Sequence, residues 1–250
     1  MPKTNQRNRK LLLEIEKLNE KNWGHLEFMP YLAGQSLKML RIFEPYHKTI
    51  LKYFEPSGKK IALVTMCSHS KPYSKSWIHQ KMDSYLSSYS KSIPPFEKWH
   101  ISSGGGMVPA ELEQVYPFCA YDWNSEEVDE QTLRAHRSTL RRRFENWLEY
   151  YVKRSSVRHI ILYTRGGGNT GRALKRAIRR NCDRFTDERG AFYEYSYNTK
   201  TEMIEITPVW VKPSIYVSYV VARDVDDVLV SPDNLSSLLD VMRQAGRELR

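Results

Sequence analysis

The feature that most constrains the fold is a repeated order along the chain, in which a short apolar run precedes a polar turn and then an amphipathic segment. The apolar runs have the length and character of buried strands, and they are "KIALVT" at 60–65, "FEKWHISS" at 96–103 and "VRHIILYTR" at 157–165. Helical periodicity is found at 76–89, 134–154 and 171–180. This alternation predicts an α/β fold with a mostly parallel central sheet flanked by helices.

The flanking sequence predicts further elements on either side of this core. Two helices are expected at 10–22 and 35–53, the second interrupted at Pro45, because proline cannot donate in a helix interior. A short helix is expected at 108–117. Beyond 191 the chain is aromatic and β-rich, which predicts a hairpin or small meander and then a final helix. We therefore expect three parts, namely an N-terminal helical segment at 1–57, an α/β catalytic core at 58–190, and a C-terminal β-rich segment with a final helix packed on the core at 191–250.

The chain carries a large positive charge that is concentrated in two helical segments. Its 39 lysines and arginines exceed its 29 aspartates and glutamates, which gives a formal net charge of +10. Such an excess favours a polyanionic partner, and the basic segments lie at 134–154 and 171–180. A solvated helix face is the alternative interpretation of each segment. The residues that we expect to contact nucleic acid are Arg137, Arg141, Arg142, Arg143, Arg165, Gly167, Arg172, Lys175, Arg176 and Arg179.

Several classes of protein are disfavoured by what the sequence lacks. No apolar stretch approaches the roughly 18–20 residues needed to span a bilayer, so no membrane partner is expected. The N-terminus has neither a continuous apolar core nor a small-residue cleavage site, which argues against a signal peptide. The three cysteines are an odd number without a CxxC pair, which argues against a disulfide framework and a thiolate zinc site. We expect a cytoplasmic protein without a bound metal or cofactor.

Reactive side chains crowd the turn that follows the first apolar run, in the stretch "CSHSKPYSKSWIH" at 67–79. Active residues in open α/β sheets gather outside the carboxyl ends of the strands, and the segments 102–109 and 164–172 are expected to reach the same edge. Cys67 can act as a nucleophile when a nearby base or positive charge favours its thiolate. The candidate catalytic residues are Cys67, His69, Lys71, Tyr73, Ser76 and His79, and the candidates for backbone contact with a ligand are Gly104, Gly105 and Gly106.

These residues also have structural interpretations. A cysteine after a strand is commonly a small buried hydrophobe, and the Lys71-Pro72-Tyr73 run can be a simple turn. The glycines at 166–168 can be a connector, since no Gly-Lys-Ser/Thr follows them as a P-loop requires. A metal held by His69, His79 and an acidic residue also stays open. The residues alone therefore predict a basic α/β protein with a polar site.

The spacing in the reactive stretch resembles a known signature. Cys67 is followed by three residues, Lys-Pro-Tyr, two residues, Ser, two residues and His, which is similar to the signature of the core catalytic domain of archaeosine synthase, an archaeal tRNA-modifying enzyme. The segment "SSGGGMVPAELEQVYPFCAYDW" at 102–123 resembles the same family. The resemblance covers roughly residues 58 to 180, with Met66 where the family has proline. The family's RNA-binding C-terminal domains are not expected here.

The resemblance implies chemistry on the nitrile of 7-cyano-7-deazaguanine that is already installed in nucleic acid. Because the chain is compact and basic, it looks most like a shorter bacterial relative that makes 7-amido-7-deazaguanine in DNA. The implied partners are then DNA containing 7-cyano-7-deazaguanine and other proteins of the modification system. Two alternatives stay open, namely a lysine or amine transferase that acts on tRNA, and a non-catalytic nucleic-acid-binding module in which the Cys–His stretch is structural.

Nitrile hydration assigns a role to most of the reactive residues. We expect the Cys67 thiolate to add to the nitrile carbon and form a thioimide. Water then adds with the assistance of His79 or His69, and the thiolate leaves as the amide forms. Lys71 and Tyr73 are expected to stabilise or protonate the nitrogen.

The remaining candidates are expected to orient the catalytic groups and the base. Ser76 is expected to orient His79. Glu111 or Glu113 is expected to accept hydrogen bonds from the guanine-like edge of the base, because a carboxylate accepts from its N1–H and amino group. The glycines at 104–106 are assigned to the same substrate-binding loop.

Overall fold

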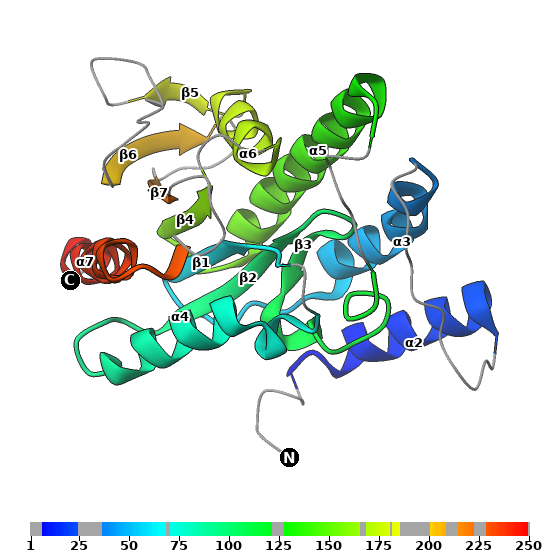
Figure 1. Cartoon of the computed structure of the whole chain (residues 1–250), viewed down its shortest axis with the longest axis horizontal. Coiled ribbons are helices and arrows are strands. Elements are labelled where there is room, and N and C mark those ends of the chain that lie inside the picture. The colour runs from blue at the N-terminus through cyan, green and yellow to red at the C-terminus, as the bar shows by residue number, and fades with distance from the viewer. Residues whose placement is uncertain are drawn as a thin grey trace.

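The chain folds around one mixed sheet with helices on both of its faces (Figure 1). The structure is a computed structural model that describes residues 7–24, 37–68, 71–121, 128–165, 169–180, 182–185, 201–208, 215–222 and 229–249. Its strands are β1 (Ile61–Met66), β2 (Phe96–Ser102), β3 (Gly106–Pro109), β4 (His159–Arg165), β5 (Cys182–Phe185), β6 (Thr201–Pro208) and β7 (Ile215–Ala222). Their order across the sheet is β3-β2-β1-β4-β7-β6-β5.

The centre of the sheet is parallel and its margins are antiparallel. β1 pairs in parallel with β2 and β4, and β4 pairs in parallel with β7. The outer strands β3, β6 and β5 run antiparallel to their neighbours. β1 is buried from Ile61 to Thr65, as expected for a parallel strand that is covered on both faces. The prediction of an α/β fold with a mostly parallel central sheet is therefore confirmed.

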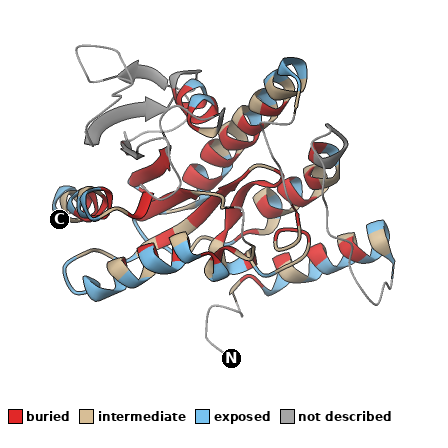
Figure 2. Cartoon of the chain, in the orientation of Figure 1, coloured by how far each residue is buried: buried red, intermediate tan, exposed pale blue. Residues whose placement is uncertain are grey.

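Helices cover the two faces of the sheet and produce three layers. They are α2 (Arg9–Trp23), α3 (Leu37–Tyr53), α4 (Trp77–Ser88), α5 (Glu130–Arg154), α6 (Asn169–Arg180) and α7 (Pro232–Glu248). Because side chains alternate along a strand, Ala62 and Val64 pack under α2, α3, α5 and α6, whereas Ile61 and Leu63 pack under α4 and α7. Figure 2 shows buried residues in the central strands and on the inner helix faces. Within the described residues, no helix is long and apolar enough to cross a membrane.

Two local expectations are wrong. α3 continues through Pro45 without interruption. The apolar face of α3 packs on the core, and the stability gained by this packing exceeds the cost of one missing backbone hydrogen bond. The segment 108–117 is not a helix, because Met107 to Pro109 pair with β2 as the edge strand β3, and only Ala110–Leu112 forms a short 3-10 turn. Pairing with β2 gives hydrogen-bond partners to backbone N–H and C=O groups that would have no partner at the ends of a short helix.

The C-terminal expectations agree with the described residues. β6 and β7 form the predicted antiparallel hairpin, and β7 joins the core sheet beside β4. The final helix α7 begins after Ser231, whose side chain accepts a hydrogen bond from the backbone N–H of Asn234. The division of the chain into three parts stays a prediction.

The connections on the two sides of β1 lie on opposite faces of the sheet. β2 lies on one side of β1 and β4 on the other. α4 connects β1 to β2 on one face, whereas α5 leads into β4 on the opposite face. In open α/β sheets such a change of direction opens a ligand crevice outside the carboxyl ends of the strands. Cys67 directly follows β1 at this edge.

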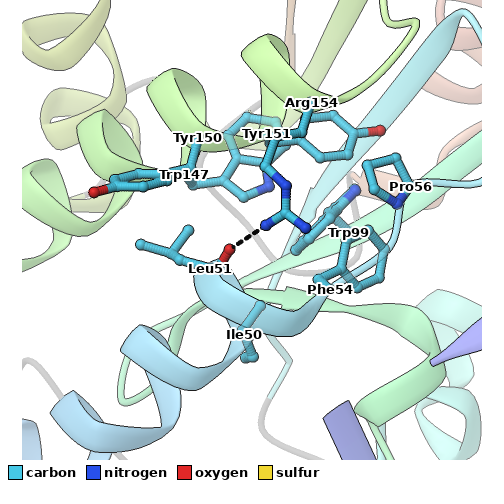
Figure 3. A pocket seen from close by; sticks show the side chains of 9 residues that line it. All are labelled: Ile50, Leu51, Phe54, Pro56, Trp99, Trp147, Tyr150, Tyr151 and Arg154. Carbon is cyan, nitrogen blue, oxygen red and sulfur yellow. Dashed lines mark hydrogen bonds between the residues drawn. The ribbon is translucent and has the colours of Figure 1, made fainter. Parts of the chain in front are cut away.

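An aromatic layer with a shallow pocket borders the segments that lead into β1 and β4 (Figure 3). Trp147 stacks on Tyr151 with ring centroids 4.9 Å apart, and Trp99 meets both rings edge-on. Arg154 donates to the carbonyl of Leu51 at 2.7 Å, and it thereby satisfies the carboxyl end of α3. This pocket therefore belongs to the opposite edge of the sheet from Cys67.

Candidate active site

Cys67 is held between the carboxyl ends of two neighbouring strands. Its backbone N–H donates to the carbonyl of Ile101 at 3.1 Å, which extends the pairing of β1 with β2 by one residue. Its Sγ lies 3.4 Å from the Oγ of Ser103, the residue after β2. The thiol is partly exposed and forms no disulfide. It is therefore partly accessible to solvent and has a hydroxyl group beside it.

Three buried hydroxyl groups form a closed cluster next to this thiol. The hydroxyl of Tyr121 lies 2.7 Å from that of Tyr73 and 2.6 Å from the Oγ of Ser102. The N–H of Gly105 donates to the Oγ of Ser102 at 2.8 Å. Burial and then the neighbouring Cys67 raise the pKa of Tyr73, and burial, Tyr73 and Cys67 raise that of Tyr121. Both phenols therefore remain protonated at neutral pH and act as hydrogen-bond donors.

Lys71 brings a positive charge onto this cluster. Its Nζ lies 4.2 Å from the ring centroid of Tyr121 and 5.9 Å from that of Tyr73. It also donates to the carbonyl of Ser68 at 3.0 Å. An ammonium over an aromatic face is attracted by the ring quadrupole. The Lys71 side chain is partly exposed, so its ammonium is fixed in direction and still accessible to a ligand.

His79 lies beneath the site and is a support for the Cys67 turn. Its buried ring lies 5.4 Å from the ring centroid of Tyr73 and hydrogen-bonds to the backbone of Met66, the residue before Cys67. Burial is the main cause that lowers the pKa of His79 well below its usual value, so the ring is neutral at pH 7. Its Nδ1 has no hydrogen-bond partner among the described residues.

Ser76 is buried at the N-cap of α4, where its carbonyl accepts from the N–H of Gln80 at 2.9 Å. The described residues include no hydrogen bond from the Ser76 hydroxyl to His79. His69 lies outside the described residues. The geometry therefore joins Cys67, Lys71 and Tyr73 in one site, while Ser76 and His79 lie behind it.

A second histidine, His100, extends this buried support. Its ring lies 4.3 Å from that of Tyr73 and 5.0 Å from that of His79, and its Nδ1 is 3.0 Å from the Oγ1 of Thr65. Burial lowers the pKa of His100 well below its usual value. Its Nε2 approaches Glu113 to 3.3 Å, and because the ring is neutral at pH 7, this contact is not an ion pair there.

The substrate-binding candidates are separated by the fold. Glu113 lies beside His100, next to the buried support, whereas Glu111 is exposed and bonds to the side chains of Arg7 and Asn8. A side chain at Gly104 would strike Phe43, and one at Gly105 would press on Phe118. A side chain at Gly106 would strike Arg143, and the positive φ of Gly106, 77°, also favours glycine at that position. These three glycines are therefore explained by close packing.

Sequence reasoning missed several residues that the fold brings to Cys67. They are Thr65, His100, Ser102, Ser103 and Tyr121. Ser102 and Ser103 stood directly before the glycine turn, and that position was the available signal. Tyr121 lies far from Cys67 in sequence, within the segment 102–123 that resembles the family, and the tertiary structure shows its hydroxyl next to that of Tyr73.

Two of the predicted nucleic-acid contacts belong to a structural cluster. Arg143 is buried, and its guanidinium donates to the carbonyls of Gly104 and Leu40 and to the carboxylate of Glu44. Arg142 holds the same carboxylate with two bonds of 2.9 Å. Burial lowers the pKa of Arg143 to about 10, so it is charged at pH 7. The prediction that Arg143 contacts phosphate is wrong, because its donors are occupied inside the protein.

The other basic candidates have different positions. Arg137, Arg141, Arg172 and Arg176 meet around a hollow between α5 and α6. Lys175 is buried on α6. The side chains of Arg165 and Arg179, and the whole of Gly167, lie outside the described residues. No group of three or more histidines, cysteines or carboxylates in the described part of the chain is placed to hold a metal ion.

The site lies inside a region shared with a protein family. The model of the family described as "Domain of unknown function (DUF5591)" matches residues 43–188, which is more than half of the chain. The chain belongs to this family. The matched region includes Cys67, Lys71, Tyr121 and the basic helices α5 and α6.

Two curated relatives are archaeosine synthase subunits, the family that the motif at 67–79 resembles. The archaeosine synthase subunit alpha of Thermoplasma acidophilum is 32% identical over 97 residues, which are 37% of this chain and 18% of that protein. The protein of the same description from Methanosarcina acetivorans is 34% identical over 88 residues, 33% of this chain and 14% of that protein. The matches thus span less than a fifth of either relative's length, and they support an archaeosine-synthase-like relationship for this part of the chain.

One solved structure is also similar, the crystal structure of AF0587, a protein of unknown function. It has a TM-score of 0.44 and 17% sequence identity, and the match covers 79% of this chain and 49% of that one. A likeness of this size supports no conclusion about the site.

Proposed function

We propose that this chain is a DNA-modifying enzyme that hydrates the nitrile of 7-cyano-7-deazaguanine in DNA to the amide, 7-amido-7-deazaguanine. The observation that carries the proposal is the partly exposed Cys67 thiol beside Lys71 and the Tyr73–Tyr121 pair, at the carboxyl edge of β1. The similarity to archaeosine synthase supports a 7-deazaguanine substrate in nucleic acid. We further propose that the chain is similar to DpdC, the bacterial 7-deazaguanine DNA-modification protein, because it is basic and shares the Cys67 motif.

The first step joins the enzyme to the substrate. The Cys67 sulfur attacks the nitrile carbon, a C–S bond forms, and one π bond of the nitrile opens. The nitrogen takes up a proton, so the product of this step is a neutral thioimide. Lys71 is the partly exposed donor that stabilises the developing charge on this nitrogen, and the Tyr121 ring and the Ser68 carbonyl hold its ammonium.

The second step releases the amide. A water molecule adds to the thioimide carbon, with a proton accepted by His69, while the buried His79 supports the Cys67 turn. The tetrahedral intermediate collapses, the C–S bond breaks, and the sulfur leaves as a thiolate that regains a proton. The net change is the addition of one water to the nitrile, so no oxidant, reductant or cofactor is required.

Mass spectrometry of nucleosides tests the reaction directly. DNA that carries 7-cyano-7-deazaguanine is incubated with the purified protein in water labelled with heavy oxygen, then digested. We expect a nucleoside heavier by one labelled water, and we expect Cys67→Ala to abolish it. Cys119→Ala is the matched control, because Cys119 is also a free, partly buried thiol. Full turnover by Cys67→Ala would refute the nucleophile role.

A second candidate function is transfer of lysine or another amine to the same nitrile in tRNA. The curated description of both relatives as archaeosine synthase subunit alpha favours this alternative. Parallel incubations with modified tRNA and free lysine separate the two functions, since a product heavier by one lysine replaces the hydrated one. A protein that binds nucleic acid but changes neither substrate would support a binding module instead.

A further inference from the structure

The helices α5 and α6 lie side by side on one face of the sheet (Figure 1). A basic hollow lies between them. The hollow has an empty volume of about 430 Å³, open solvent included, and six residues line it. They are Arg137, Ser138 and Arg141 of α5, and Arg172, Ala173 and Arg176 of α6. Each helix thus contributes two arginines four residues apart, which places them on the same side of the helix.

The lining of this four-arginine hollow carries positive charge only, although the two arginines of α5 have ion-pair partners on their own helix. None of the described residues that line it is acidic. Arg137 approaches Glu130 to 3.5 Å, and Arg141 approaches Glu145 to 3.5 Å, so the α5 pair has carboxylates nearby along its own helix. Arg172 and Arg176 are exposed on α6. Four guanidinium groups around one concave site attract an anion with more than one negative charge.

The hollow is connected to the candidate active site through α5. The Nε2 of His136 lies 3.0 Å from the carbonyl of Ser103, whose Oγ is 3.4 Å from the Cys67 thiol. Arg137 is the next residue of the helix. α6 begins directly after β4, which is parallel to β1, so Arg172 in its first turn lies at the same edge of the sheet as Cys67.

We propose that the four-arginine hollow binds two successive phosphates of the nucleic-acid strand whose base enters the Cys67 site. The two arginines of each helix are separated by a rise of about 6 Å, which suits neighbouring phosphates along one strand. Arginine binds phosphate oxygens in a bidentate manner, and such backbone contacts set the register of a strand without reading its bases. This inference rests on the proposed function only for the identity of the base.

The salt dependence of binding tests the hollow separately from the chemistry. We measure the affinity of the full chain for a fluorescent, unmodified single strand over a series of salt concentrations. Each phosphate contact contributes about 0.7 to the slope of log K against log salt for a single strand and about 0.9 for a duplex. We expect the double variant R172Q/R176Q to lower the slope by about 1.4 with a single strand.

A matched control removes the same charge from the other face of the sheet. Arg243 and Arg247 are also four residues apart on one helix, but they lie on α7. We expect the variant R243Q/R247Q to have the same slope of log K against log salt as the protein without substitutions. An unchanged slope for R172Q/R176Q, or an equal loss for both double variants, would overturn the site.

Two further measurements complete the test. Thermal melting of both double variants shows whether they remain folded. We expect R172Q/R176Q, which changes two exposed helix residues, to leave the melting temperature unchanged. Inorganic phosphate is titrated as a competitor of the strand. If phosphate binds as tightly as the strand, the hollow is a site for a free anion and the proposal is wrong. If R172Q/R176Q lowers the slope but the protein hydrates no nitrile, the phosphate-binding site is supported and only the proposed reaction is refuted.

Discussion

Two polar clusters flank the turn at 102–106, and they use their charges in opposite ways. In the first, Arg143 and Arg142 surround Glu44, and Arg143 also holds the carbonyl of Gly104. In the second, Cys67 lies beside Ser103, with Lys71 over the buried Tyr121. The first cluster has its donors satisfied inside the protein. The second leaves a thiol and an ammonium partly exposed above a closed layer of hydroxyl groups.

The difference separates a structural cluster from a reactive one. A buried charge is tolerated only with good partners, and removing one partner leaves the others uncompensated. A reactive site instead presents its groups to a ligand and keeps the supporting groups buried beneath them. Changes in the Glu44 cluster should therefore act mainly on stability, and changes at Cys67 mainly on turnover.

The largest loss of stability is expected from Arg143→Leu. The variant leaves two buried carbonyls without their donor and Glu44 with Arg142 as its remaining partner. Breaking a buried pair typically costs about 3–5 kcal/mol in the free energy of unfolding. Urea denaturation measures this loss. Arg141→Gln is the control on the same helix, and because Arg141 is partly exposed we expect a change within about 0.5 kcal/mol. Equal losses in the two variants would contradict the distinction between the clusters.

A smaller loss of stability is expected when the hydroxyl cluster is interrupted. Tyr121→Phe keeps the ring beneath Lys71 and removes the group that joins Tyr73 to Ser102. A buried polar group left unsatisfied costs about 1–3 kcal/mol. Tyr121→Leu also removes the aromatic face, so it should lower turnover further than Tyr121→Phe. Similar turnover in both variants would show that the role of Lys71 in turnover does not depend on the aromatic ring of Tyr121.

The pH dependence of stability should report on Glu44. Its bonds to Arg142, its largest favourable contact, lower its pKa to about 2, from an ordinary value of 4.5. The unfolded chain therefore binds a proton at higher pH than the folded one, and this contribution is complete above pH 4.5 and lost as pH falls toward 2. We expect Glu44→Gln to flatten this part of the acid denaturation curve. An unaltered curve would show that Glu44 does not titrate in this way.

The smallest change in stability is expected at Cys67, where the largest change in turnover is expected. Cys67→Ala removes a partly exposed thiol that makes one contact of 3.4 Å, so the free energy of unfolding should change by less than about 0.5 kcal/mol. Urea denaturation and nitrile turnover are measured on the same preparation. A large loss of stability would place Cys67 with the structural cluster.

Local patterns in the sequence predicted the architecture well. Apolar runs of strand length, each followed by a helical segment, are sufficient for an α/β sheet with a parallel centre, because side-chain periodicity and short right-handed connections leave few topologies. The same patterns placed Cys67 after β1. They failed at 106–109, where a segment with a proline at a helix-start position pairs as an edge strand.

The sequence by itself determined the strand and helix order, the position of Cys67 at the end of a strand, and the basic character of α5 and α6. Only the tertiary structure decided which of those basic residues are available, since Arg143 faces the core while Arg137 and Arg141 meet the arginines of α6. It also brought Tyr121 to Tyr73. The physical reason is that periodicity records which face of an element is apolar, whereas partners distant in sequence are selected by packing across the whole sheet.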